Sequence, residues 1–154
     1  QLFSHSINFN ISMGNPTIKN ETIIEAAKLA QAHSFIESLP DGYDTILEQR
    51  GQQLSKGQAQ LISLARAIAC PAPIILLDEA TSSLDAGSEE IVQNAINNLV
   101  KNKTTLVIAH RLSTIHNADQ IFILKNGKII NSGNHDFLIS NCEEYKSLYK
   151  KQLR

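Results

Sequence analysis

The sequence predicts an α/β layered fold, in which helices pack against a small sheet. Stretches with the apolar period of a helix alternate with a short, continuously apolar run at residues 73–77 and a stretch rich in β-branched residues at 104–109. Runs of this length are typical of strands that are buried on both faces. An Asn126-Gly127 pair then separates two further apolar runs, which predicts a β-hairpin. Together these observations favour a layered fold over a helical bundle.

Length, composition and charge are those of a soluble globular chain. Its 154 residues, 42% of them hydrophobic, are enough for one domain with a moderate core. The 14 basic and 15 acidic residues give a net charge of −1, so we expect no nucleic-acid partner. Cys70 and Cys142 lack the spacing of a zinc site, which indicates reduced thiols in a cytosolic setting.

The lengths of the apolar runs predict whether this chain crosses a membrane, and the first residues indicate whether it is part of a longer protein. No apolar run reaches the roughly 18 to 20 residues that cross a bilayer, so other segments or another chain would have to span it. Gln1 leads straight into the apolar pair Leu2-Phe3, which we interpret as a cut through a longer protein.

The first forty residues contain two predicted segments. Residues 2–13 show no clean period, which predicts an irregular surface segment with a short helix, and a Gly-Asn-Pro turn follows. From Asn20 to about Leu39 the pattern predicts one amphipathic helix, with Thr22 and Glu25 as a candidate capping box. Its apolar positions are Ile23, Ala26, Ala27, Leu29, Ala30, Ala32, Ile36 and Leu39.

Further helix signals follow a turn at residues 40–43. Ser55 precedes a long apolar-periodic segment, so we expect it to be the N-cap of a helix that ends near Cys70. Asp85 can cap the next helix, and residues 135–153 predict two short helices with a basic end. The apolar positions of the helix after Asp85 are Val92, Ala95, Ile96 and Leu99.

The start of the helix at Ser55 allows two interpretations. The first is a simple cap, made by the hydroxyl of Ser55. The second is an anion site, because the free N–H groups and the positive dipole end of a helix favour phosphate there. Gly57 would let the backbone approach such a ligand closely.

Carboxylates and a histidine follow the two predicted strands. Asp78 and Glu79 end the first apolar run, and His110 ends the second. The carboxyl ends of parallel strands in an open α/β sheet are where ligands bind, so we expect these side chains to face one crevice. The structural alternative is that the acids end a strand and the histidine is a packed residue.

The carboxylates of Asp78 and Glu79 are residue types that catalyse phosphoryl transfer. Asp78 is a candidate Mg²⁺ ligand, because such sites hold the ion with few carboxylates plus phosphate oxygens. Glu79 would then orient or deprotonate the attacking water. Asp85 is either the cap of the following helix or a contact to a partner subunit.

Four of these stretches occur in the order and spacing found in the nucleotide-binding domain of ABC transporters. They resemble the signature motif, the Walker B strand with its catalytic glutamate, the D-loop and the switch histidine. The likeness covers nearly the whole chain and is greatest to the exporter branch, in which this domain is fused to a membrane-spanning domain. In order along the chain, the four stretches are residues 54–58, 74–79, 83–85 and 105–110.

The resemblance implies a P-loop NTPase-like ABC ATPase domain fragment with a helical subdomain and a partial parallel sheet. Residues 1–70 would form the helical and signature subdomain, in which about residues 1–16 face the coupling helices of the membrane part. Residues 71–154 would form the Walker B and switch-histidine core with the C-terminal helices.

The resemblance also implies a function. Two such domains would close head to tail around two ATP molecules with Mg²⁺, and closure would drive transport by an exporter at the cytoplasmic face of a membrane. Asp78 (metal), Glu79 and His110 (catalytic) would serve a site in the same subunit, and Asp85 would be the D-loop contact. The signature residues, which would bind the nucleotide of the partner domain, are Leu54, Ser55, Lys56, Gly57 and Gln58.

Three departures from the family pattern stand out. The sequence contains no G-x-x-x-x-G-K-[ST] phosphate loop, so we expect this chain alone to be inactive, although the full-length protein would be an ATPase. Lys56 replaces a glycine of the signature, which could strain the backbone or add a cation near phosphate. Where exporters commonly have Gly-Glu-Arg-Gly before the signature, this chain has Glu48-Gln49-Arg50-Gly51, which departs from the pattern of a loop that contacts the partner domain.

Two other functions share these motifs. The first is the ATPase head of a DNA-maintenance protein, which the neutral charge and the absence of heptad repeats disfavour. The second is an inactive subunit that lends its signature motif to a partner, which Glu79 and His110 disfavour and Lys56 favours. Homodimer and heterodimer are both compatible with the sequence, and the transported substrate is not encoded in this chain.

Overall fold

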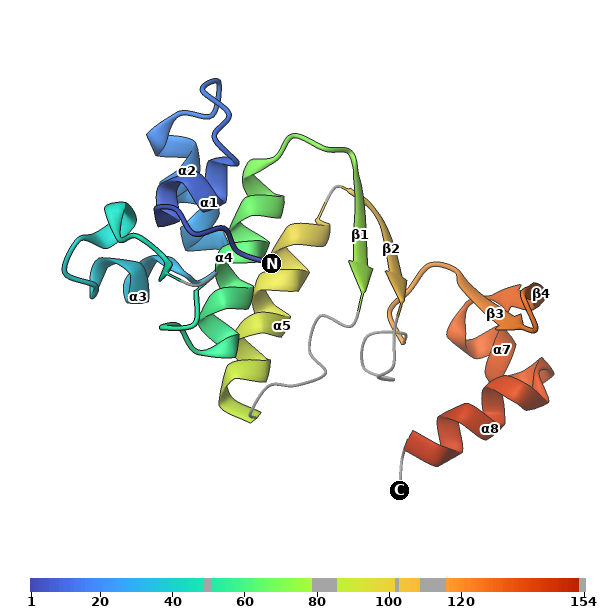
Figure 1. The fold of residues 1–154 in the computed structure, drawn as a ribbon. Coiled ribbons are helices and arrows are strands. Elements are labelled where there is room, and N and C mark those ends of the chain that lie inside the picture. Colours follow the sequence, from blue (N-terminus) through green and yellow to red (C-terminus); the bar gives the residue numbers. More distant parts are fainter. Residues whose placement is uncertain (49–50, 79–85, 102, 109–115, 153–154) are drawn as a thin grey trace. The chain divides into compact units, whose positions relative to one another are not determined.

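The computed structural model describes residues 1–48, 51–78, 86–101, 103–108 and 116–152 (Figure 1). The chain forms two compact units, Gln1–Val107 and Ile108–Arg154. The expected subdomain boundary at residue 70 lies inside the first unit and stays a prediction.

Helix α4 (Lys56–Ala69) is the centre of the first unit. It packs against α1 (Ile7–Ser12), α2 (Asn20–Leu29) and α5 (Ala86–Val100). Ser55 caps α4 and the helix ends one residue before Cys70, as predicted. The apolar positions predicted for α5 are all buried, and they share one core with the fully buried side chains Ile7, Ile11, Ile23, Ile36, Leu47 and Ile62.

The N-terminal segment, residues 1–13, is an integral part of this core. The prediction of a surface segment was wrong, because Leu2, Ile7 and Ile11 are buried, although the short helix is present. Asn10 is also fully buried. A buried amide is tolerated only when its donors and acceptor are paired.

Arg66 and the backbone of the segment supply those partners. The side-chain Nδ2 of Asn10 donates to the carbonyl oxygens of Phe3, His5 and Ser6 at 3.0–3.3 Å. Its Oδ1 accepts from the N–H of Phe3 at 2.8 Å and from Nη2 of Arg66 at 3.0 Å. Burial of the Arg66 guanidinium lowers its pKa. This network fixes the segment to α4.

The single helix predicted from Asn20 to Leu39 is two helices, α2 and α3 (His33–Glu37). The chain reverses at Gln31, whose φ is +58°. The N–H of Ala32 donates to the carbonyl of Ala27 at 2.8 Å, and the N–H of Gln31 donates to that of Lys28 at 3.0 Å. This is a Schellman termination, which usually has glycine at the left-handed position.

The start and one apolar position of that helix also differ from the prediction. Lys19, without a side-chain cap bond, precedes α2, so the capping box of Thr22 and Glu25 was wrong. Leu29 is 44% exposed, so it lies on the outer side of the last turn of α2, whose Ala26 and Ala27 are buried. A 3₁₀ turn, η1 (Gly42–Asp44), follows at the predicted turn.

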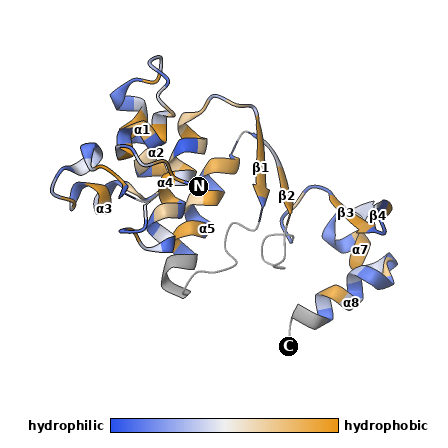
Figure 2. Ribbon diagram, viewed as in Figure 1, coloured by the Kyte–Doolittle hydropathy of each residue, from blue (hydrophilic) through white to orange (hydrophobic). Residues whose placement is uncertain are grey.

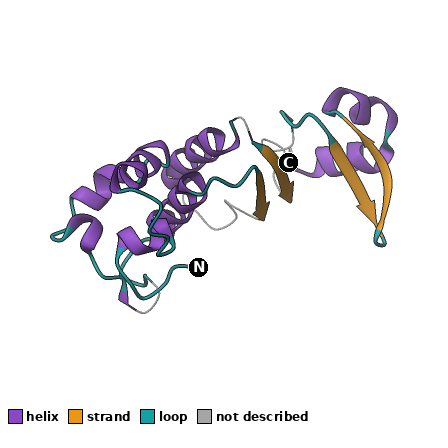
Figure 3. Ribbon diagram, turned by 90° about the horizontal axis from the view of Figure 1, so that it is seen from above, coloured by secondary structure: helices purple, strands orange, loops and turns teal. Residues whose placement is uncertain are grey.

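Strands β1 (Ile74–Asp78) and β2 (Thr104–Ile108) form a two-stranded sheet. They run in the same direction, as Figures 1 and 3 show. The N–H of Thr104 donates to the carbonyl of Pro73 at 3.1 Å, which aligns the two strand starts. The small parallel sheet is confirmed.

Only one face of this sheet is covered by the described residues. Ile75 and Leu77 pack on the core of the first unit. Ile74, Leu76, Leu106 and Ile108 are 55–74% exposed, so burial on both faces was a wrong prediction. Figure 2 shows that both strands are nevertheless apolar along most of their length.

The second unit contains the predicted hairpin. Strands β3 (Ile121–Lys125) and β4 (Lys128–Gly133) pair antiparallel. Asn126 and Gly127 both have positive φ, as a two-residue type I′ turn requires. The two predicted tail helices, α7 (His135–Asn141) and α8 (Glu143–Gln152), follow.

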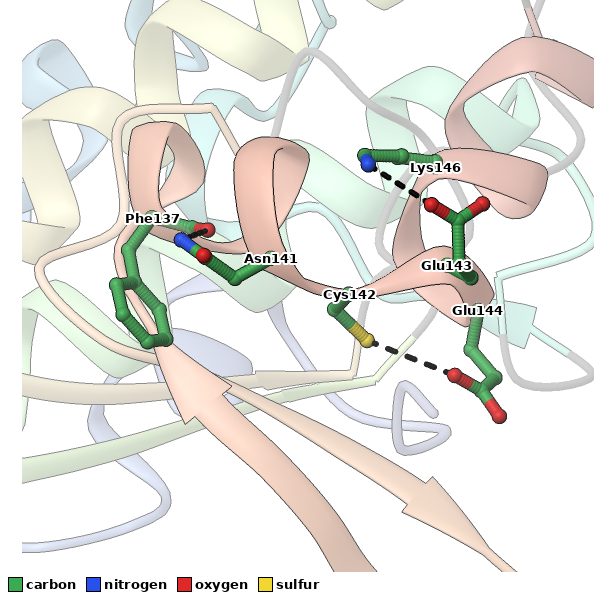
Figure 4. A network of polar contacts seen from close by, with 6 residues as sticks. All are labelled: Phe137, Asn141, Cys142, Glu143, Glu144 and Lys146. Carbon is green, nitrogen blue, oxygen red and sulfur yellow. Dashed lines mark hydrogen bonds and ion pairs between the residues drawn. The ribbon is translucent and has the colours of Figure 1, made fainter.

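Polar contacts surround the junction of α7 and α8 (Figure 4). Lys146 Nζ lies 2.8 Å from Glu143 Oε1, and this contact lowers the pKa of the Glu143 carboxyl. Asn141 Nδ2 donates to the carbonyl of Phe137 at 2.8 Å. Because these groups are mostly exposed, they specify the geometry more than they stabilise it.

We expect Asn10→Ala to lower the free energy of unfolding by about 2–4 kcal/mol, because it leaves several buried backbone groups without a partner. Urea denaturation of the chain, followed by circular dichroism, measures this. Asn8→Ala is the matched control, since Asn8 lies in the same helix and makes one exposed side-chain bond to Asn20. Equal losses in the two variants would contradict the role of Asn10.

Candidate functional site

The start of α4 is a reciprocal capping box. The Oγ of Ser55 accepts from the N–H of Gln58 at 3.1 Å, and Oε1 of Gln58 accepts from the N–H of Ser55 at 3.0 Å. The simple cap predicted from the sequence is therefore present. It does not exclude the anion site, because the N–H groups of Lys56 and Gly57 have no acceptor among the described residues.

These free N–H groups fit a phosphate ligand. They stand at the positive end of a 14-residue helix, where a negative charge is favoured. Ser55 and Lys56 are exposed and Gly57 is buried, so a ligand would reach the helix start from the side of Ser55 and Lys56. Because the Oγ of Ser55 only accepts in the cap, its hydroxyl proton is free to be donated to a phosphate oxygen.

Lys56 does not strain the backbone. It is the first residue of α4, and it is not among the described residues with positive φ, which are Met13, Gln31, Asn126 and four glycines. Of the two expectations for this substitution, strain is thus wrong. The added cation near a bound phosphate remains a prediction.

The loop before Ser55 is held by its own amide contacts and by the N-terminal segment. Gln53 Nε2 donates to the carbonyl of Ile46 at 2.9 Å, and its Oε1 accepts from the N–H of Glu48 at 3.1 Å. Gly51 has φ of +87°, and a Cβ there would lie 3.1 Å from Leu2 Cδ1. The positive φ favours glycine at this position, and a larger residue would also make a tight contact with Leu2.

Asp78 lies at the carboxyl end of β1 and is exposed, so its carboxylate is accessible to a cation. Among the described residues no group of three or more His, Cys, Asp or Glu side chains could hold a metal. A single carboxylate still fits Mg²⁺, which takes most of its ligands from phosphate and water. Strand β2 runs parallel beside β1 and ends at Ile108, so the carboxyl ends of the two strands lie at the same edge of the sheet.

Glu79, Asp85 and His110 lie outside the described residues, so their convergence with Asp78 stays a prediction. Sequence reasoning missed two residues around α4, namely Gly51 in the loop before the helix and Arg66 in its last turn. Gly51 could have been noticed as an isolated glycine before a helix. Arg66, in an apolar-periodic helix, carries no local signal of its buried partner.

Residues 3–82 match the sequence pattern of the ABC transporter family, and this chain belongs to that family. It is 54% identical over 152 residues to ABC transporter B family member 4 of Dictyostelium discoideum, covering 99% of this chain and 20% of that protein. It is 50% identical over 151 residues to a Staphylococcus aureus (strain NCTC 8325 / PS 47) protein whose name describes a multidrug export ATP-binding/permease protein. That match covers 98% of this chain and 26% of the relative.

A solved structure shares the fold. It is described as the structure of a bacterial Atm1-family ABC exporter with ATP bound, and the TM-score is 0.87 at 36% sequence identity. The match covers 99% of this chain and 27% of that chain. The family and the fold class expected from the sequence are confirmed, and the relatives favour an exporter over a DNA-maintenance ATPase.

The chain spans 20% and 26% of the lengths of the two named relatives. None of the helices among the described residues combines the length and the apolar character that crossing a membrane requires.

We expect Ser55→Ala to lower the free energy of unfolding by about 1 kcal/mol, because the N–H of Gln58 loses its acceptor. Urea denaturation measures the loss. Ser63→Ala is the control in the same helix, since the Oγ of Ser63 donates to the carbonyl of Ala59, a bond that the helix does not need. A smaller loss at Ser55 than at Ser63 would contradict the cap.

Proposed function

We propose that this chain is the signature and Walker B portion of the ATP-binding and ATP-hydrolysing domain of an ABC exporter. It couples ATP binding and hydrolysis to transport across a membrane. The observation that carries this proposal is the exposed start of α4, where the family's signature residues meet a helix terminus with free N–H groups. The name and title of the exporter relatives, which mention ATP, support the same ligand.

The signature residues bind the ATP of the partner domain. The N–H groups of Lys56 and Gly57 and the hydroxyl of Ser55 donate to its γ-phosphate oxygens, with the dipole of α4 adding to the attraction. The cap bond between Ser55 and Gln58 holds the hydroxyl in position, so little side-chain entropy is lost when the phosphate binds. The Lys56 ammonium adds a cation at the same place.

The strand ends serve the ATP of the same subunit. Asp78 holds Mg²⁺ directly or through water, and this ion neutralises phosphate charge when it is bound. Glu79 takes a proton from the attacking water, and His110 donates to the γ-phosphate. Asp85 contacts the partner domain across the interface.

The partners of the chain follow from this role. A second nucleotide-binding domain, identical or different, completes each ATP site. A membrane-spanning domain of the same transporter receives the movement through residues 1–16, which places this domain at the cytoplasmic face of the membrane. Nucleic acid has no part in the mechanism.

We expect Glu79→Gln in the full-length protein to reduce steady-state ATP turnover by at least about 100-fold, because the amide cannot accept the proton of the attacking water. Phosphate release from purified transporter in lipid measures turnover, and Glu90→Gln is the control on the exposed side of α5. Undiminished turnover would refute Glu79 as the base. It would support a second candidate function, in which the chain only lends its signature motif to a partner, an interpretation that Lys56 favours.

We expect this chain alone to show no ATP turnover and only weak nucleotide affinity, because its sequence lacks the lysine-bearing phosphate loop. Isothermal titration calorimetry with Mg-ATP tests the affinity. A dissociation constant in the micromolar range would overturn the expectation.

A further inference from the structure

Arg66 connects the last turn of α4 to the N-terminal segment. Its Nε donates to the carbonyl of Asn10 at 2.7 Å, and its Nη2 donates to Oδ1 of the same residue at 3.0 Å. Nη1 donates to the carbonyl of Gln1 at 3.0 Å, and the guanidinium carbon lies 5.2 Å from the centre of the Phe3 ring. One side chain thus holds the segment at both of its ends.

The segment also contacts the chain that leads into α4. Leu2 packs on Gly51, four residues before the cap at Ser55. The backbone of the segment exchanges hydrogen bonds with the chain that leads into this loop, from the N–H of Leu47 to the carbonyl of His5 at 3.0 Å and from the N–H of Ile7 to that of Thr45 at 3.1 Å. The segment is therefore held to α4 by Arg66 and to the chain before α4 by these contacts.

Aromatic rings form the outer side of this segment. Phe3 is 45% exposed and lies edge-on to Phe9, with ring centres 6.4 Å apart. His5 stacks on Phe9 at 3.8 Å and is exposed. A partner protein that bound to these rings would displace the N-terminal segment, which Arg66 holds.

We propose that Arg66 is a positioning residue, through which the N-terminal segment and α4 move as one body. A displacement of the segment then reaches Ser55 along the helix from Arg66 back to Lys56, ten residue steps and about 15 Å of continuous helix. The planar fork of arginine suits this role, because it engages the backbone and side-chain oxygens of Asn10 together. The inference rests on the proposed function, in which movement passes between this segment and the membrane-spanning domain.

A double-mutant cycle in the full-length transporter tests the proposal. The variants are Arg66→Met, Ser55→Ala and the pair, and the readout is kcat/KM for ATP, normalised to folded protein. When two residues at this separation act independently, the fold-changes in kcat/KM that their substitutions cause multiply in the double variant. We expect the pair to retain at least threefold more kcat/KM than the product of the single effects, because a misplaced α4 matters less once its Ser55 contact is lost. A ratio below threefold overturns the proposal.

Lys103→Met is the matched control. The Nζ of Lys103 donates to the carbonyls of Ala67 and Cys70 at 3.4 and 3.3 Å, so it holds the same end of α4 without touching the N-terminal segment. Its effect should multiply with that of Ser55→Ala. Coupling as large as that of Arg66 would show general loosening of α4 and would also overturn the proposal.

Two further outcomes are distinguished by the same measurements. If Arg66→Met does not fold, Arg66→Lys replaces it in the cycle, with the same threefold criterion for kcat/KM. Lysine keeps the charge and the aliphatic stem but cannot reach both Asn10 oxygens. If the wild-type transporter hydrolyses no ATP, the proposed function fails and this inference falls with it. If the wild-type transporter hydrolyses ATP and the effects of the two single substitutions multiply in the double variant, only the role of Arg66 is refuted.

Discussion

The buried amide of Asn10 and the guanidinium of Arg66 are the contact on which the rest of the first unit depends. Asn10 has no exposed surface, yet its donors and its acceptor all have partners. Unpaired polar groups in such a place would oppose folding, so the segment can enter the core only in the conformation that satisfies them. Apolar packing supplies most of the stabilisation, while this network determines which arrangement is stable.

The position of the start of α4 at Ser55 depends on that arrangement. Leu2 occupies the space that Gly51 leaves free, and the loop from Ile46 to Gln53 is closed by the amide of Gln53. The cap of α4 then fixes the hydroxyl of Ser55. A chain of contacts therefore leads from the interior of the protein to exposed groups that suit a phosphate.

Sequence reasoning succeeded where the determinants are local. Ser55 and Gln58 lie within one turn, and Asn126-Gly127 specifies its own turn, so both elements were predicted. It failed at Gln31, because a left-handed residue without glycine gives no signal, and the resulting Schellman turn depends on how α2 and α3 pack. It also failed at Asn10, whose burial is set by Arg66, 56 positions away along the chain.

The strands show a third kind of limit, since an apolar run predicts a strand but not what covers it. Ile74 and Leu76 alternate with Ile75 and Leu77, and only the latter pair reaches the core. With Leu106 and Ile108, the former pair are exposed apolar residues on a two-stranded sheet, and exposed apolar strands promote aggregation. Handling this polypeptide in isolation therefore calls for low concentration, mild detergent or a solubilising fusion.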